Sequence, residues 1–177
     1  MPVKPIITIP NPILEPPAER VGEIDDVTKN VIRDLLDTVL AAKNPEGAGL
    51  AAPQIGVSKR VCVVRRFIET SDKLVTKEYI LVNPKIISAS KETDIHYEGC
   101  LSVPDVYGQV ERAKKIKVKA LDENNQPIRI STSGFFARVI QHEVDHLDGV
   151  LFTTKLIGDP ITQFQFDQLM EEETEVL

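Results

Sequence analysis

Apolar residues recur every three or four positions between residues 27 and 40, the spacing of one face of an α-helix. The residues on that face are Val27, Val31, Leu35 and Val39. Asp25 or Asp26 stands in the N-cap position and Asn44-Pro45 interrupts the pattern, so the sequence predicts an amphipathic helix between them.

A second helical pattern, FFARVIQHEVDHL, occupies residues 135–147. Thr132-Ser133-Gly134 precedes it as a start signal, and Asp148-Gly149 follows it as a glycine C-terminus. We expect a third, short helix to begin at Asp159-Pro160. The residues expected on its inner face are Ile161, Phe164 and Leu169.

Short β-branched runs separate the first two helices and predict strands. They are RVCVVRRF (60–67), YILVNP (79–84), KIISAS (85–90), KKIKVKAL (114–121) and PIRIST (127–132). The fourth run alternates strictly, so Lys115, Lys117 and Lys119 are expected on the solvent face of a half-exposed strand rather than in a basic binding patch. Helices and strands are segregated along the chain, which predicts an α+β fold with mixed or antiparallel β-sheets and a hairpin packed around the second helix.

No repeat or flexible linker divides the chain, so residues 1–177 are expected to form one domain. Residues 1–17 hold six of the 12 prolines and are expected to form an extended arm that lies across the body. Residues 158–177 form an acidic C-terminal segment with six carboxylates and no Lys or Arg. The whole chain has 21 basic and 27 acidic residues, a net charge of −6, so the remaining residues balance to zero.

This charge distribution creates no field that would attract nucleic acid or anionic lipid. The sequence has no apolar run of membrane-spanning length and no secretory signal pattern. Its two cysteines are too few for a disulfide framework. We therefore expect a cytoplasmic protein in a reducing compartment.

His142-Glu143-Val144-Asp145-His146 brings two of the three histidines of the chain one helical turn apart. At this spacing both imidazoles can reach one metal ion. Glu143 can then face a water molecule at the metal, which is the position of a general base. A lone histidine on an apolar face would be a core residue, but this pair with a glutamate between favours a metal site.

The third ligand is expected to be a cysteine. The extended zinc-protease pattern would need a histidine where Phe152 stands, and the downstream glutamates lie in the acidic segment. Cys62 lies in the apolar run VCVV and is typical of a buried core residue. Cys100 lies in the sequence EGCLS, expected to be a loop, where its thiolate would complete a His2Cys site with a fourth position open for water.

The segment GAGLAAPQ (47–54) combines a small-residue backbone, which another chain can approach closely, with the amide donor Gln54. No Gly-Lys-Ser/Thr ending follows, so the segment is not a phosphate-binding loop.

Taken in order, GAGLAAPQ, EGCLS and QHEVDHLDG resemble the three signature motifs of the peptide deformylase family. The arm sequence IPNPIL is similar to the N-terminal segment of that family, and LDENNQPIRIS to the hairpin before its metal-binding helix. The resemblance therefore covers nearly the whole chain. It implies a metal-dependent hydrolase that removes the formyl group from the N-terminal formyl-methionine of new polypeptides and releases formate.

The resemblance also implies roles for individual residues. The metal ligands would be Cys100, His142 and His146. Glu143 would be the acid/base, and Gln54 with the backbone N–H of Leu101 would stabilise the oxyanion.

Substrate contacts are implied on both sides of this centre. Gly49 would pair with the peptide backbone as an added strand. A methionine pocket is expected at Phe135, Arg138 and Val139 with His96 across from them, and the Arg138 head would reach water. The other expected contacts are Ala48, Glu98 and Gly99. Tyr107 stands where some relatives have an arginine, a departure from the family pattern.

The resemblance to the bacterial enzymes implies Fe²⁺, although a His2Cys set also suits Zn²⁺, Ni²⁺ or Co²⁺. The implied partners are an N-formylmethionyl peptide and the ribosome near the nascent-chain exit, in the cytoplasm or in an organelle lumen. Two alternatives remain at this point: an HExxH metallo-endopeptidase, and a non-catalytic peptide-binding module on the same fold.

Overall fold

The computed structural model describes residues 3–43, 46–70 and 73–175, which form two antiparallel sheets and three α-helices. The five-stranded sheet has the order β1 (Gly49–Ala51), β2 (Val61–Glu69), β3 (Leu74–Ala89), β6 (Lys115–Leu121), β7 (Pro127–Ser133). The three-stranded sheet has the order β4 (Thr93–Cys100), β5 (Val103–Ala113), β8 (Leu156–Ile161). The helices are α1 (Asp26–Ala41), α2 (Gly134–Leu147) and α3 (Gln163–Glu175), with 3-10 turns η1 (Pro12–Leu14), η2 (Ala52–Ile55) and η3 (Phe152–Lys155). The predicted α+β class is therefore confirmed.

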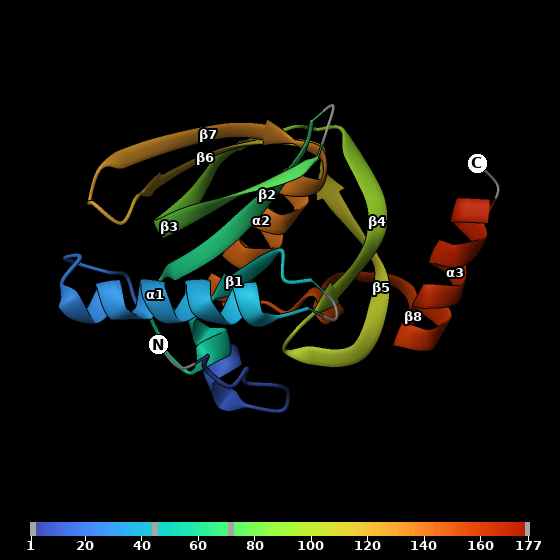
Figure 1. Ribbon diagram of the computed structural model, residues 1–177, viewed down its shortest axis with the longest axis horizontal. Helices are drawn as coiled ribbons and strands as arrows, with labels where there is room; N and C mark the ends of the chain where they lie inside the picture. The colour runs from blue at the N-terminus through green and yellow to red at the C-terminus, as the bar shows by residue number, and fades with distance from the viewer. Residues whose placement is uncertain (1–2, 44–45, 71–72, 176–177) are drawn as a thin grey trace.

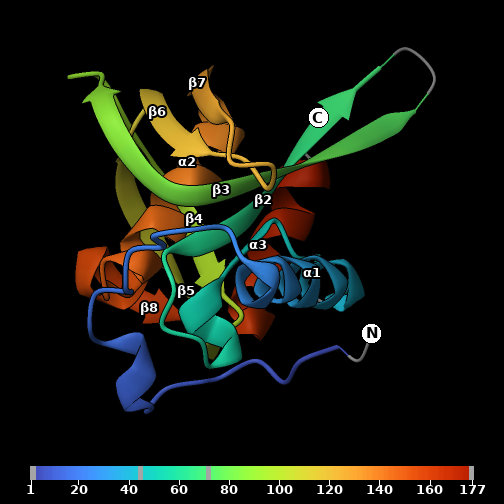
Figure 2. The ribbon, with the colours of Figure 1, turned by 90° about the vertical axis from the view of Figure 1, so that its left-hand side faces the viewer.

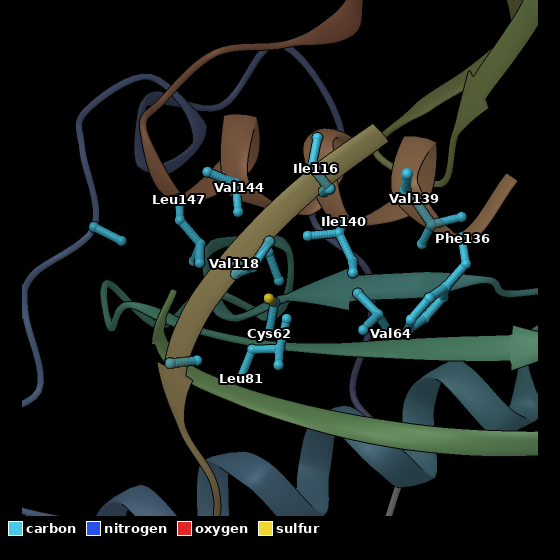
Figure 3. Packing of buried hydrophobic residues seen from close by; sticks show 14 residues of the cluster. Cys62, Val64, Leu81, Ile116, Val118, Phe136, Val139, Ile140, Val144 and Leu147 are labelled. Carbon is cyan, nitrogen blue, oxygen red and sulfur yellow. The ribbon is translucent and has the colours of Figure 1, made fainter. Parts of the chain in front are cut away.

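Helix α2 lies at the centre of the molecule and contacts strands of both sheets (Figure 1). Its apolar face packs on one face of β2 and on the neighbouring strands, and Ile140 and Val144 belong to the same buried cluster as Cys62 (Figure 3). Cys62 is buried in this core, as predicted. Each fully buried apolar side chain of this size stabilises the fold by about 1.5–3 kcal/mol relative to its exposed state.

Helix α1 covers the opposite face of β2, where Val61 and Val63 belong to the same cluster as Leu35 and Val39. Because successive side chains of a strand point to opposite faces, burial on both faces accounts for the uninterrupted apolar run VCVV. The predicted N-cap is confirmed at Asp25, whose carboxylate accepts a hydrogen bond from the backbone N–H of Thr28 at 2.8 Å.

Two details of the first helix differ from the prediction. Val27, placed on the inner face by the sequence pattern, is 58% exposed. The predicted stop signal, Asn44-Pro45, lies outside the described residues, and the helix itself ends at Ala41.

The proline-rich arm lies across the body, below η2 in Figure 2. Its backbone donates hydrogen bonds from Ile7 to the carbonyl of Gln54 at 2.8 Å and from Ile9 to the carbonyl of Ser102 at 2.9 Å. The arm therefore joins the two segments that carry Gln54 and Cys100.

Several predicted strands are confirmed, including β6, whose three lysines are exposed while Ile116, Val118 and Ala120 are buried. The runs 79–84 and 85–90 form one strand, β3, instead of two. Asn83 adopts a positive φ of 53° before Pro84, and the register with β6 shifts there. A bulge of this kind bends a strand without ending it.

The third helix was predicted with the wrong start. Asp159 and Pro160 belong to β8, which pairs with β5, and α3 begins only at Gln163. Phe164, expected on the inner face of this helix, is 69% exposed. Across the described residues, no helix is both long enough and apolar enough to cross a membrane.

Candidate active site

The end of β4 and one face of α2 bring together the three predicted metal ligands. The ligand atoms of Cys100, His142 and His146 all lie within 4.8 Å of one another. Cys100 Sγ lies 3.1 Å from His146 Nε2, and the two imidazole centroids are 4.9 Å apart. The spacing of four residues along α2 produces this approach because residues i and i+4 lie on one face of a helix.

Glu98 orients the first of these histidines. Its carboxylate contacts His142 Nδ1 at 2.9 Å, which leaves Nε2 as the ring atom available to a metal. Burial opposes a charge on His142, but its hydrogen bonds to Cys100 and Glu98 more than offset this cost, and the pKa of the imidazole lies above its ordinary value. Burial also opposes the charge on Glu98, but hydrogen bonds from Arg112 and His142 hold the pKa of its carboxyl well below its ordinary value.

Two arginines hold Glu98 in this orientation. Arg112 donates from Nε and Nη2 to the two carboxylate oxygens, both at 2.9 Å, and Arg138 donates from Nη1 at 2.8 Å. Arg112 also contacts Asp145, and Arg138 contacts Asp94. Such bidentate contacts between buried charges fix geometry more strongly than a single hydrogen bond does.

This donor set fits one divalent metal ion. One thiolate and two imidazoles are ligands of first-row metals, and three protein donors leave coordination positions free, as in catalytic sites. The carboxylate behind His142 is the usual outer partner of a metal-binding histidine.

Glu143 lies beside this triad without taking part in it. Its carboxylate is buried, and Oε2 has no hydrogen-bond partner among the described residues. The pKa of Glu143 is raised to about 7, mainly by burial. Neighbouring charges have smaller effects on this pKa, some raising it and some lowering it. A carboxylate with a pKa near neutrality can both accept and donate a proton at physiological pH.

Gln54 faces the triad from η2. Its Oε1 accepts a hydrogen bond from the backbone N–H of Ala51 at 2.8 Å, so its amide nitrogen points the other way. That nitrogen donates to Ser102 Oγ at 3.1 Å and lies 3.6 Å from Cys100 Sγ. The amide is therefore held with its donor group toward the reaction centre.

A cavity of about 280 Å³ opens over these residues. Its wall includes nearly all of the predicted site: Ala48, Gly49, Gln54, Glu98, Gly99, Cys100, Leu101, Phe135, Arg138, Val139, His142 and Glu143. It also includes residues that were not predicted: Glu46, Gly47, Tyr97, Tyr107 and Phe166.

Comparison with known proteins identifies the family of the chain. Residues 3–159 match the polypeptide deformylase family. The chain belongs to that family. It is 43% identical to the peptide deformylase of Thermomicrobium roseum over 177 residues, which cover 98% of this chain and 96% of the relative. With peptide deformylase 1 of Bacillus subtilis it shares 46% identity over 156 residues, covering 88% of this chain and 91% of the relative.

Solved deformylase structures have the same fold. A class I type b peptide deformylase from Acinetobacter baumannii, bound to the compound K3U, superposes with a TM-score of 0.78 at 36% identity and covers 88% of this chain and all of that one. The same enzyme has been solved with Met-Ala-Ser bound, again with a TM-score of 0.78 at 36% identity, covering 88% of this chain and 99% of that one. Family membership confirms the predicted enzyme, a hydrolase that removes N-formyl groups from new polypeptides, rather than an endopeptidase or a non-catalytic module.

The structure places two of the predicted residues differently from the deformylase-based expectation. His96 does not line the cavity; its side chain is 68% exposed and lies 3.9 Å from Asp94. The adjacent residue, Tyr97, lines the cavity instead. The Arg138 head does not reach water but is buried against Glu98 and Asp94.

Sequence reasoning missed the residues that hold the deformylase site in place. Arg112 carries no motif signal of its own, since it acts on a residue brought close only by the fold. Ser102 ends the motif EGCLS, but the motif does not indicate that its hydroxyl accepts a hydrogen bond from Gln54. For Arg112 a signal was present in the sequence: Glu98 lies two residues before the expected ligand Cys100, and an arginine 14 residues after this glutamate is consistent with a buried pair on adjacent strands.

Proposed function

We propose that the cavity over Cys100, His142 and His146 is where this chain hydrolyses the formamide bond of N-formylmethionyl peptides. The observation that carries the proposal is the convergence of these three donors next to the buried carboxylate of Glu143 and the amide donor of Gln54. A formamide is a poor electrophile, so hydrolysis needs an activated water, a stabilised oxyanion and a proton for the leaving amine.

Cys100, His142 and His146 would hold the metal, and Glu98 would fix the orientation of His142. When bound, a divalent ion supplies Lewis acidity and lowers the pKa of a water molecule from about 16 to about 7. We propose Fe²⁺ as the physiological metal, with Zn²⁺, Ni²⁺ or Co²⁺ as alternatives in purified protein, because a thiolate and two imidazoles accept all four.

Glu143 would take the proton of the attacking water and deliver it to the nitrogen of the leaving amine. The Gln54 amide and the backbone N–H of Leu101 would donate hydrogen bonds to the oxyanion as charge develops on the formyl oxygen. The loss of one such donor typically costs about 10²–10³ in rate.

The substrate would bind along a sheet edge. Strand β1, which contains Gly49, is an edge strand of the five-stranded sheet, and β4, which ends at Cys100, is an edge strand of the other sheet. An extended peptide can add to such an edge through main-chain hydrogen bonds, and this mode accepts many sequences after the first residue. Phe135, Val139, Ala48 and Gly99 would contact the bound peptide.

Formate release tests the proposal directly. Protein prepared without oxygen and loaded with Fe²⁺ is expected to release one formate per formyl-Met-Ala-Ser consumed, and chelated protein to release none until metal is restored. Metal-loaded protein that binds the peptide but releases no formate would overturn the proposal.

Because the substrate is the N-terminus of a new polypeptide, we further propose that the protein acts where translation occurs, in the cytoplasm or an organelle lumen, close to the ribosomal exit. Co-sedimentation with ribosomes that carry formylated nascent chains, compared with empty ribosomes, tests this point.

A further inference from the structure

An arginine is buried at a position of β2 where the strand pattern favours an apolar residue. Val61 and Val63 are buried on the face of β2 that α1 covers. Arg65 is the next residue on that face, and it is only 6% exposed. Charged side chains are almost never buried to this extent unless they are paired, because the charge loses its hydration. The partners of Arg65 therefore indicate its role.

The guanidinium of Arg65 reaches the segment just before β1. Its Nη1 donates to the carbonyl oxygen of Gly47 at 2.8 Å and to Oε1 of Glu46 at 3.1 Å. Its Nε lies 3.5 Å from Oε1 of Glu78 on β3. The backbone N–H of Arg65 donates to the carbonyl oxygen of Ala48 at 2.7 Å. One residue of β2 thus contacts three successive residues of the segment that leads into β1.

The pairing with β2 sets the direction in which the backbone of Gly49 points. Gly49 lies opposite Val64, and Ala48, one residue earlier, directs its carbonyl toward β2. Successive residues of an antiparallel strand point their N–H and C=O groups alternately toward the partner strand and away from it. The N–H and C=O of Gly49 therefore point to the free edge of the sheet. Ala51 follows the same alternation, since its N–H donates to the side chain of Gln54 at 2.8 Å and not to β2.

Arg65 does not line the cavity over the metal ligands, whereas the segment 46–49 does. Arg65 therefore acts on a bound peptide through this segment and not by contact. The segment also packs closely on α1, because a Cβ at Gly47 would lie 2.7 Å from the carbonyl oxygen of Val39. The lead into β1 is thus held between α1 and Arg65.

We propose that Arg65 is a positioning residue of the deformylase site, which fixes the free edge of β1 by holding Gly47 and Ala48. This inference rests on the proposed function, in which Gly49 pairs with the backbone of the substrate. A main-chain hydrogen bond depends on the direction of its N–H and C=O groups, so a less firmly held edge binds a peptide less tightly. The effect grows with the length of peptide backbone that pairs with β1.

The test compares Arg65→Met with Arg66→Met in the full-length, metal-loaded enzyme. Arg66 is the next residue of β2, is exposed, and does not line the cavity over the metal ligands. Each variant is assayed with formyl-Met-Ala-Ser and with formyl-methioninamide, which share the first residue but differ in the length of backbone that can pair with β1. The measured quantity is kcat/KM for the tripeptide divided by kcat/KM for the amide.

We expect this ratio to fall about fivefold in Arg65→Met, which corresponds to about one lost main-chain hydrogen bond. The loss should appear mainly as a higher KM for the tripeptide, because the reacting groups are not changed. The ratio should stay within twofold of wild type in Arg66→Met. A purely structural role for Arg65 would lower kcat/KM for both substrates together and leave the ratio unchanged, and that result would overturn the inference.

Arg65→Lys keeps a positive charge near Glu46 and Glu78 but lacks the planar fork of donors of the guanidinium. Its ratio is expected between those of wild type and Arg65→Met. If Arg65→Met does not fold, Arg65→Lys alone decides. A ratio at least twofold below that of wild type then supports the inference, and a wild-type ratio overturns it.

Failure of the proposed function itself has a different signature. If the wild-type enzyme releases no formate from either substrate, the proposed function fails. The role of Arg65 is then still tested by calorimetric binding of the products. The affinity for Met-Ala-Ser should weaken about fivefold in Arg65→Met, while the affinity for methioninamide stays within twofold of wild type. Equal weakening for both ligands would overturn the inference.

Discussion

At the scale of single residues, the proposed reaction needs a carboxylate that exchanges protons and does not bind the metal. Glu143 packs against the backbone of Gly49 so closely that a Cβ at Gly49 would lie 2.5 Å from Glu143 Oε1. The clash that a larger residue would make with Glu143 therefore explains the glycine at position 49, in addition to the substrate pairing proposed for it. The close packing limits where the carboxylate can move, which would fix the point of the proton transfer proposed for Glu143.

Replacing Glu143 with glutamine keeps the shape of the side chain and removes its ability to accept a proton. We expect Glu143→Gln to bind one metal ion per chain, as the wild type does, and to lose about 10²–10⁴ in kcat. Metal analysis and formate release measure the two effects, with Glu111→Gln on the exposed face of β5 as the matched control. Loss of metal from Glu143→Gln would contradict the assignment.

The two cysteines offer a second comparison at this scale. Cys100→Ser is expected to weaken metal binding by at least about tenfold, because a hydroxyl is a poorer ligand than a thiolate for these metals. Cys62→Ser should leave metal affinity unchanged and lower only stability, since its sulfur lies in the core between β2 and α2. Competition with a chromogenic chelator measures affinity, and equal effects at both cysteines would count against the site.

At the scale of elements, the proline-rich arm packs closely against the C-terminal end of α2. Gly149 ends α2 with a φ of +73°, and a Cβ there would lie 2.1 Å from the carbonyl oxygen of Glu15. Gly158 has a similar φ of +76°, but a Cβ there would meet no atom within 4 Å. Substitutions at these two glycines therefore distinguish the cost of backbone strain alone from the added cost of a clash with the arm.

We expect Gly158→Ala to destabilise the protein by about 1–2 kcal/mol, the cost of a left-handed conformation for alanine. Gly149→Ala is expected to cost more, because the arm backbone must also move away from α2. Urea unfolding measures both variants, and equal losses would show that the arm does not pack on α2 as described.

The elements that the sequence predicted best are those with a strong internal pattern. Helices α1 and α2 carry helical periodicity and end signals, and β6 alternates strictly. Strands β4 and β5 were not predicted, because the polar sequence of β4 and the exposed side chains of both strands hide the alternation. The boundary of β8 was missed since only pairing with β5 makes Asp159-Pro160 extended.

The site residues also divide into those with a local sequence pattern and those brought together only by the fold. The three proposed metal ligands and Glu143 lie in short motifs, so their types and spacing predicted them from the sequence. The residues that orient them, Arg112 and Arg138, are joined to Glu98 across 14 and 40 residues, and only the fold brings them together. Phe166 could not be predicted for the same reason, because its position depends on where β8 ends.

At the scale of the whole molecule, one buried cluster of charges joins the three-stranded sheet to α2. Glu98 of β4 is bonded to Arg112 of β5 and to Arg138 and His142 of α2. Asp145, also on α2, contacts Arg112 and receives a further ion pair from Lys155 at 2.7 Å. The single-domain organisation remains a prediction, and this cluster supports it, because it connects elements between Glu98 and Lys155 through charges that are costly to expose singly.

The cluster has a consequence for acid stability. The pKa of Glu98 is lower in the folded protein than its ordinary value of 4.5, so its charge stabilises the fold fully above about pH 4.5. This stabilisation is lost as the pH falls below that value through the folded pKa. Glu98→Gln removes the carboxylate that pairs with the buried guanidinium groups of Arg112 and Arg138. We expect this change to lower the free energy of unfolding by about 3 kcal/mol at pH 7.

Between pH 5 and pH 3 the difference between wild type and Glu98→Gln should narrow, because the wild type alone loses the contribution of this carboxylate. Urea unfolding in the presence of a chelator measures the difference without a contribution from metal release. Glu92→Gln removes the exposed partner of Lys114 and is expected to follow the wild type at every pH, since solvent screens that pair. A difference between wild type and Glu98→Gln that stays constant down to pH 3 would show that the Glu98 charge does not contribute to folding through its arginine partners.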